Sequence, residues 1–252
     1  MRTSNITCQG QRDTETGEPD DAISIKSGSE GGWEKRPAMD LARSLPNLET
    51  YEKPYDPKVP VLCMDEQPVQ LLKETRSPIP ATAKHAKRVD YEYERAGTAA
   101  IFMFAEPLAG WREVAVRERK TKVDWAIEMA RLLEGRYAAC ARVILVCDNL
   151  NTHTKGAFYE AFTPERARSL VRRLEFCYTP KHGSWLNIAE NELSALTCQC
   201  VSDRRFADVE TLRKETAAWS NDVNAVQRGV DWQMKIDDAR TKLKSVYPTI
   251  KL

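Results

Sequence analysis

The run Arg142-Val-Ile-Leu-Val-Cys147 constrains the fold of this chain more than any other segment. Its five consecutive apolar residues, three of them β-branched, are too few for a typical helix and are characteristic of a strand buried on both faces. Such strands lie in sheets that helices cover on both sides. The run stops at Asp148, and mostly short polar residues follow it as far as His153. Because sites in open α/β sheets collect at strand ends, we expect a polar site there.

Strand and helix signals elsewhere extend this pattern to an α/β fold with a mixed sheet. Thr121 is a suitable N-cap with Asp124 three residues later, and Pro164 suits a first helical turn. Prolines at positions 68, 78 and 80 indicate a loop over residues 67–90. We expect strands at 59–64, 98–104, 111–116, 142–147 and 174–178, and helices at 121–133, 155–162, 164–170, 185–201 and 209–221.

The beginning of the chain differs in composition from the rest. Residues 1–50 are rich in Gly, Ser and acidic residues and too poor in apolar residues to offset the entropy of ordering. We expect this segment to be disordered or poorly ordered, and residues 51–252 to form one folded domain. No signal peptide and no apolar run of the ~20 residues of a membrane helix is present, which predicts a cytoplasmic protein. The net charge of +1 permits a DNA partner without requiring one.

Three acidic residues stand at positions suited to metal binding. Asp65 follows the expected strand 59–64, and Asp148 follows the strand 142–147. Glu190 lies at the edge of the apolar stripe of the helix expected from Trp185. Taken alone, each aspartate is equally explained as a cap of the following turn or helix, and a lone helical glutamate is more simply explained as a solvated surface residue. Glu192 is the rival for the third position, and the helical pattern predicts that it is the more solvated of the two glutamates.

Taken together, the three acids suit the cleavage of a phosphodiester bond. That reaction needs several hard oxygen ligands around a pair of Mg²⁺ ions held about 4 Å apart. One ion activates the attacking hydroxyl group, and the other stabilises the leaving oxygen. Two acids from neighbouring strand ends and one from a covering helix meet this need, so the sequence predicts a metal-dependent nuclease.

Three stretches around these acids share the order and spacing of a known enzyme family. They are Val61-Leu-Cys-Met-Asp-Glu66, Val146-Cys-Asp-Asn-Leu-Asn-Thr-His153 and Tyr178-Thr-Pro-Lys-His-Gly-Ser-Trp-Leu-Asn-Ile-Ala-Glu190. The chain thereby resembles the DDE transposases of bacterial insertion sequences in the mariner superfamily. The resemblance implies a ribonuclease-H-like fold with a mixed five-stranded sheet, and Asp65, Asp148 and Glu190 as a catalytic triad that binds two Mg²⁺ or Mn²⁺ ions. It also implies DNA strand cleavage and strand transfer, with element ends and target DNA as partners of a homodimer.

The resemblance has one departure, which leaves two alternatives open. Such transposases carry a pair of N-terminal helix-turn-helix regions, and residues 1–50 show no such pattern, so we expect a truncated copy. The first alternative is therefore an inactive remnant that only binds DNA or dimerises. The second is a phosphoacceptor signalling domain, but the hairpin expected between Asp65 and Asp148 fits that architecture poorly.

Polar residues near the three acids are candidates for supporting them or for contacting DNA. We expect two asparagines to orient Asp148 and a third to order the turn before Glu190. Two histidines and a lysine flank the site, where they either contact phosphate or metal or hold the loops in place. These six residues are Asn149, Asn151, His153, Lys181, His182 and Asn187.

Overall fold

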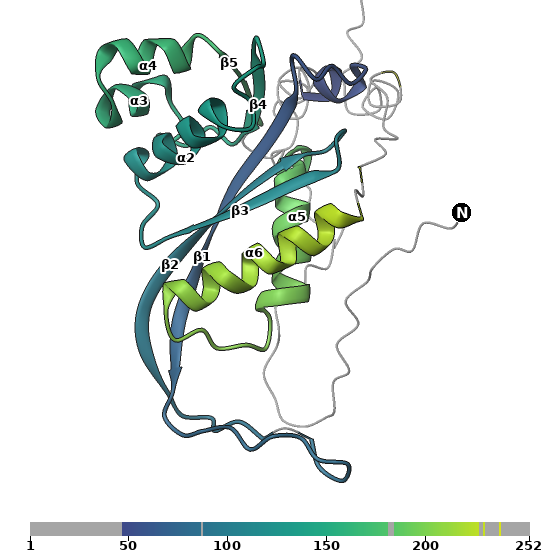
Figure 1. Cartoon of the computed structure of the whole chain (residues 1–252), viewed down its shortest axis with the longest axis vertical. Helices are drawn as coiled ribbons and strands as arrows, with labels where there is room; N and C mark the ends of the chain where they lie inside the picture. The colour runs from purple at the N-terminus through teal and green to yellow at the C-terminus, as the bar shows by residue number, and fades with distance from the viewer. Residues whose placement is uncertain (1–46, 87, 181–183, 227–228, 230–236, 238–252) are drawn as a thin grey trace, which may run out of the picture.

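A mixed five-stranded sheet with helices on both faces forms the framework of the molecule (Figure 1). The computed structural model describes residues 47–86, 88–180, 184–226, 229 and 237. The strand order is β3-β2-β1-β4-β5. The strands are β1 (Val61–Glu74), β2 (Tyr93–Glu106), β3 (Trp111–Arg117), β4 (Val143–Cys147) and β5 (Leu174–Tyr178). β1, β2 and β3 are antiparallel neighbours, whereas β4 and β5 run parallel to β1, so the expected α/β class with a mixed sheet is confirmed.

The long strands β1 and β2 project from the sheet as a hairpin arm, drawn at the bottom of Figure 1. β1 continues through Asp65, and its pairing with β2 reaches the pair Glu74 and Tyr93. The expectation that this strand ends at Asp65 is therefore wrong, and so is the loop expected over residues 67–74. The neighbouring strand β4 ends beside Asp65. Beyond this point, β1 is paired with a strand on one side only, which is β2.

Two features of the arm explain why the sequence was misleading here. Val69 and Leu71 are buried while Pro68 and Gln70 between and beside them are exposed, which is the alternation of a strand with one covered face. Pro68 suggested a loop because proline cannot donate to a strand ladder. Beyond Asp65, however, β1 has an open edge, and proline is tolerated at such an edge because no ladder hydrogen bond is needed there.

The alternation of side chains along the strands divides the core into two layers. The helices are α2 (Lys122–Glu134), α3 (Lys155–Ala161), α4 (Pro164–Val171), α5 (Ile188–Leu196) and α6 (Val209–Ala225). Cys63 and Val146 belong to the layer that contains residues of α5 and α6. Met64 and Leu145 belong to the layer that contains residues of α2, α3 and α4. Neighbouring residues in one strand therefore face different sets of helices.

Most helices lie where the sequence predicts them. Thr121 and Asp124 form a capping box at the start of α2, as their spacing indicated. The helix expected over 185–201 is instead divided into a 3₁₀ turn, α5 and a π-helical turn (Thr197–Val201). The break occurs because Asn187 is extended and caps α5 with its side chain. No helix within the described ranges is both long enough and apolar enough to cross a membrane.

The first described residues, 47–52, belong to the folded part of the chain. Residues 47–52 form a short helix, and Asn47, Leu48 and Tyr51 are buried. The Tyr51 hydroxyl donates a hydrogen bond of 2.7 Å to the carbonyl of Leu186. The poorly ordered segment proposed for residues 1–50 is therefore wrong for residues 47–50, and its remainder lies outside the described residues.

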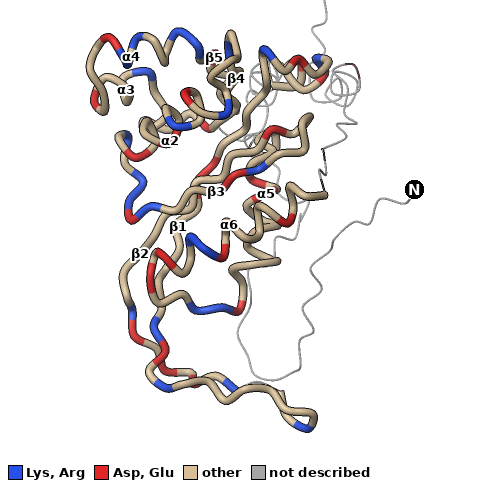
Figure 2. Tube along the Cα trace, viewed as in Figure 1, with Lys and Arg blue, Asp and Glu red and all other residues tan. Residues whose placement is uncertain are grey.

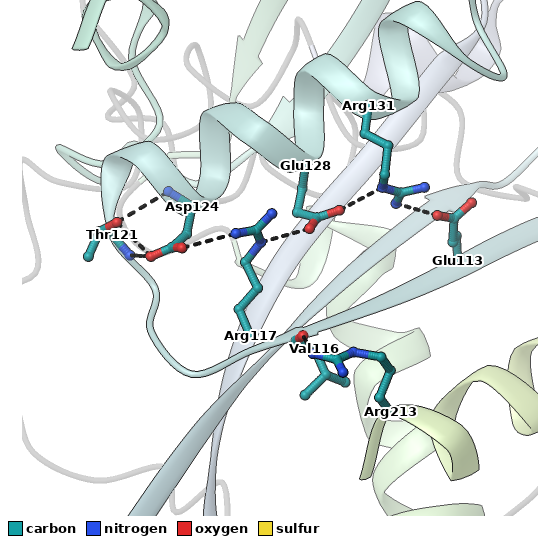
Figure 3. A network of polar contacts seen from close by, with 8 residues as sticks. All are labelled: Glu113, Val116, Arg117, Thr121, Asp124, Glu128, Arg131 and Arg213. Atoms are coloured by element: carbon teal, nitrogen blue, oxygen red, sulfur yellow. Dashed lines mark hydrogen bonds and ion pairs between the residues drawn. The ribbon is translucent and has the colours of Figure 1, made fainter. Parts of the chain in front are cut away.

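Charged side chains cover the outer edge of the sheet at β3 (Figure 3). Arg117 contacts Asp124 and Glu128 of α2 at 3.2 and 2.7 Å, and Glu128 also pairs with Arg131 at 2.8 Å. On the other side, Arg213 of α6 donates a hydrogen bond of 3.1 Å to the carbonyl of Val116. Charges along an exposed edge strand oppose pairing with a second sheet.

Candidate active site

Asp65 and Asp148 lie on adjacent parallel strands, at the point where β4 ends. The register pairs Leu62 with Leu145 and Cys63 with Val146. Continued by two residues, it places Asp65 beside Asp148. The Asp65 side chain faces the α5 side of the sheet, because it lies two residues beyond Cys63 in β1, whereas Asp148 lies just beyond the end of β4. The two acids that the sequence predicted at strand ends are thus neighbours in the sheet.

Glu190 approaches this position from the covering helix α5. It lies in the first turn of α5, and Asn187 caps that turn by accepting a hydrogen bond from the backbone N–H of Ala189. The Asn187 side chain also donates a hydrogen bond of 2.8 Å to the carbonyl of Met64, the residue before Asp65. The buried side chain of Asn187 therefore connects the start of α5, which carries Glu190, to the residue of β1 that precedes Asp65.

An open depression of about 570 Å³ separates the helix from the strand at this point. Asp65 and Glu190 both line it. The remaining lining residues include Glu66, Gln67, Ser194, Thr197 and Ser202. The depression is thus rich in oxygen atoms and accessible from outside, which suits a site that must admit an extended, charged substrate.

The electrostatics of Asp65 place all three acids in one neighbourhood. Its pKa is raised from the ordinary value of 3.8 to about 6. Burial is the main cause, and a hydrogen bond from the N–H of Glu66 opposes it. Repulsion by Asp148, Glu66 and Glu190 raises the pKa of Asp65 further. A partly buried carboxylate with further carboxylates nearby is typical of cation sites and of catalytic sites.

Asp65 and Glu190 lie on the border of the depression without forming a closed cage. Within the part of the chain that the structure describes, no three His, Cys, Asp or Glu side chains are grouped tightly enough to hold one ion. Mg²⁺ differs from structural metals in this respect, because it keeps several waters and uses only one or two carboxylates together with substrate phosphate oxygens. The donor set, which consists of hard carboxylate oxygens on an open surface, fits that kind of ion.

His153 occupies a position that the sequence did not specify. Its ring is fully buried between Glu66, at 2.9 Å from Nε2, and Asp148, at 2.7 Å from Nδ1. Burial lowers the pKa of His153, but contacts with Asp148, Cys147 and Glu66 outweigh burial and raise it to about 12. The two carboxylates on either side of the ring thus favour its protonated form.

The two asparagines expected to orient Asp148 do not do so. Asn149 and Asn151 are both exposed, and the contact to the Asp148 carboxylate comes from His153 instead. Short polar residues after a strand are equally suited to a solvated turn, which is what they form here. Glu66 could have been found from the pattern, because an acid next to Asp65 in a strand must face the opposite layer.

Glu192 is buried, which contradicts the prediction that it is the more solvated of the two glutamates. Its side chain accepts two hydrogen bonds of 2.7 Å from Arg112 of β3, and both residues are almost inaccessible. Helical spacing shows which side of a helix is apolar but not where an arginine of another element lies. Glu190, which is partly exposed, remains the candidate third acid.

Two of the six candidates, Lys181 and His182, lie outside the described residues, so the structure gives no position for them.

Comparison with known proteins identifies the family to which this geometry belongs. The family model described as "DDE superfamily endonuclease" matches residues 60–213, which is more than half of the chain. The chain belongs to the DDE superfamily endonucleases. The match spans Asp65, Asp148 and Glu190. No curated protein matches the chain in sequence.

Solved structures extend the comparison of this DDE endonuclease domain to its fold. It is similar to the chain in "Crystal structure of the Mos1 mariner paired end complex with Mn", with 14% identity, a TM-score of 0.51, and coverage of 88% of this chain and 66% of that one. It is also similar to the chain in "Crystal structure of the Mos1 Strand Transfer Complex", with 13% identity, a TM-score of 0.51, and coverage of 90% and 68%. The expected ribonuclease-H-like fold is thereby confirmed.

Asp65→Asn is expected to stabilise the metal-free DDE endonuclease domain at neutral pH. Because the pKa of Asp65 is about 6 in the folded chain and 3.8 ordinarily, stability is lost as the pH rises through this interval. Above this pH interval, the amide of Asn removes a destabilisation of roughly 1–3 kcal/mol that the charged carboxylate causes. The amide oxygen can still accept the hydrogen bond from the N–H of Glu66. Urea unfolding in a chelator at neutral pH should show this gain. A gain of the same size near pH 4, where the carboxyl group is already protonated in the folded chain, would contradict the explanation.

Proposed function

We propose that this domain is the catalytic part of a cut-and-paste transposase. In this function, Asp65, Asp148 and Glu190 bind two Mg²⁺ or Mn²⁺ ions, and the domain cleaves a DNA strand and transfers the freed 3′ end to target DNA. The observation that carries the proposal is the geometry: the partly buried Asp65 lies where β4 ends, beside Asp148 in the continued register and across the depression from Glu190. Such an arrangement costs stability unless a cation is bound, so its presence calls for a function.

The three acids would contribute to the reaction in different ways. Asp65 is held by β1 within the sheet, so its position is the most rigid of the three. Asp148 follows β4 directly, and its side chain is 39% exposed. Glu190 lies across the depression, on a helix tied to β1 through Asn187. Divalent ions, when bound, supply activation of the attacking hydroxyl group and stabilisation of the leaving oxygen.

DNA is the partner that this arrangement suits. The depression is open, so a phosphodiester backbone can enter it. Its phosphate oxygens can occupy the metal coordination positions that the three acids do not fill. Lys, Arg, Asp and Glu are interspersed along the helices and the hairpin arm (Figure 2), so the affinity for DNA would depend on local contacts more than on net charge. The Mos1 chains that share the fold come from a paired end complex and a strand transfer complex. We propose element ends and target DNA as partners, and a homodimer as the assembly on DNA.

The finer family assignment belongs to the same proposal. The three stretches that contain Asp65, Asp148 and Glu190 resemble transposases of bacterial insertion sequences in the mariner superfamily. These stretches supply Asp65, Glu66 and Glu190 to the depression, and their Asn187 ties the start of α5 to β1. We therefore propose an insertion-sequence element as the source of the natural DNA substrate.

A plasmid-nicking assay tests the proposed function. Supercoiled DNA is incubated with the full chain and Mg²⁺, Mn²⁺ or a chelator, and the appearance of nicked circles is measured. We expect nicking with either ion and none with the chelator or with Asp148→Asn. Asp222→Asn, which alters an exposed carboxyl group on α6, is the matched control and should cut like the parent. DNA binding without metal-dependent cleavage would instead indicate a non-catalytic fragment.

A further inference from the structure

We infer that Glu66 and His153 form a positioning pair that orients the Asp148 carboxylate for metal binding. The inference rests on the proposed function and assigns a role to two residues outside the three acids. His153 Nε2 lies 2.9 Å from Oε1 of Glu66, and Nδ1 lies 2.7 Å from Oδ1 of Asp148. One ring thus connects β1 to the first residue after β4, across the two strands that carry Asp65 and Asp148.

The first argument is that the Glu66 side chain points to the α2 side of β1, although the residue also borders the depression. Strand residues alternate between faces, so Glu66 shares the side of Leu62 and Met64, which pack toward α2 and α3. Its side chain is only 3% exposed. A buried carboxylate is costly unless it is paired, and the partner it has here is His153. Glu66, the neighbour of the candidate metal ligand Asp65, therefore binds His153.

The second argument is that His153 is itself held on several sides. Its ring packs against the ring of Trp125, with 5.5 Å between centroids. The Tyr178 hydroxyl donates a hydrogen bond of 2.8 Å to its carbonyl, and its own N–H donates one of 3.1 Å to the carbonyl of Leu150. The position of the ring is therefore determined by the core and by β5 together with the turn that begins at Asp148.

The third argument concerns the two oxygens of Asp148. Oδ1 is buried, and no described residue makes an aligned hydrogen bond to it, although Nδ1 of His153 lies 2.7 Å away. The ring nitrogen also contacts the carbonyl of Asp148 at 3.3 Å. Because the side chain as a whole is 39% exposed, the other oxygen is the one that faces outward. His153 thus keeps one oxygen inward and leaves the other available to an ion.

This arrangement predicts an effect on metal affinity in particular. Residues that orient metal ligands typically change metal affinity or activity by about 10–100-fold when they are removed. Loss of the pair should free the Asp148 side chain to rotate while all three acids remain present. We therefore expect weaker metal binding and a higher metal concentration for half-maximal nicking, with much of the rate recovered at saturating metal.

The test measures Mn²⁺ binding to the full chain by electron paramagnetic resonance, without DNA, and nicking as a function of Mn²⁺ concentration. The variants are His153→Ala, Glu66→Ala and Glu66→Gln, with Asp222→Asn as the control. We expect His153→Ala and Glu66→Ala to bind Mn²⁺ about 10–100-fold more weakly. Glu66→Gln retains an oxygen that can accept from Nε2 and should recover part of the affinity.

The possible outcomes separate this inference from the proposed function. If the parent binds Mn²⁺ and nicks DNA while Glu66→Ala and Glu66→Gln bind Mn²⁺ as the parent does, the positioning role is wrong and the proposed function stands. If the parent neither binds Mn²⁺ nor nicks DNA, both fail. If His153→Ala does not fold, the two Glu66 variants decide, because the His153 ring and its contacts with Trp125 and Tyr178 are still present in them.

Discussion

Glu190→Gln is expected to lower the rate of DNA nicking by roughly 10³-fold, because a carboxylate that holds a catalytic ion contributes several kcal/mol to the reaction. The substitution keeps the length and shape of the side chain and removes its charge. Glu190 is partly exposed beside the depression, so the folded chain should be no less stable. Single-turnover nicking at saturating Mn²⁺, together with urea unfolding of the same samples, measures both quantities.

Glu192→Gln provides the matched comparison on the same helix. Glu192 is buried against Arg112 and does not line the depression, so its amide variant should lose stability but keep most of the nicking rate per folded molecule. The two variants are therefore expected to show opposite patterns. If Glu192→Gln abolished nicking in folded protein while Glu190→Gln retained it, the assignment of the third acid would be reversed.

Arg112→Met is expected to cost about 3–5 kcal/mol of unfolding free energy, the range found when one partner of a buried ion pair is removed. Arg112 and Glu192 are joined by two hydrogen bonds of 2.7 Å, and their side chains are 2% and 7% exposed. Without the guanidinium group, the Glu192 carboxylate is left charged and dehydrated. The Asn224 side chain also accepts a hydrogen bond of 2.8 Å from the N–H of Arg112 and donates one of 2.7 Å to its carbonyl. These two bonds hold β3 in place, so the strand cannot easily move to admit water.

Two further variants control this experiment. Lys122→Met breaks the ion pair of Lys122 with Glu160, whose side chains are 39% and 52% exposed, and should cost no more than about 1 kcal/mol. The double variant Arg112→Met/Glu192→Leu removes both buried charges and should recover much of the loss. Urea unfolding measures all three variants. A loss for Arg112→Met as small as that for Lys122→Met would show that the buried pair contributes little.

The buried pair has a structural consequence for the proposed site. It joins β3 to α5, and Asn224 joins the same point of β3 to α6. Glu190 lies two residues before Glu192 on α5, so the pair helps to determine how Glu190 is presented to the strands. The site therefore depends on a contact between elements that are far apart in the chain.

Local patterns were sufficient for several elements of this protein. The apolar run before Asp148 is β4, and the capping box at Thr121 begins α2 as its spacing indicated. These features are readable because one strand's burial or one helix's first turn is encoded within a few consecutive residues. The resemblance of three stretches to DDE transposases likewise rests on local order and spacing, and the family match over residues 60–213 bears out the family.

Other features depend on which distant segments meet, and only the tertiary structure decided them. Pro68 looked like a loop residue until the open edge of β1 beside the end of β4 made it acceptable in a strand. Glu192 looked solvated until Arg112 from β3 was found against it. His153 became part of the site because Glu66 from β1 meets it across the sheet. The chain by itself thus determined β4, the start of α2 and the family. The burial and pairing of charged groups were decided by contacts between remote segments, because a charge can be buried only where another part of the chain neutralises it.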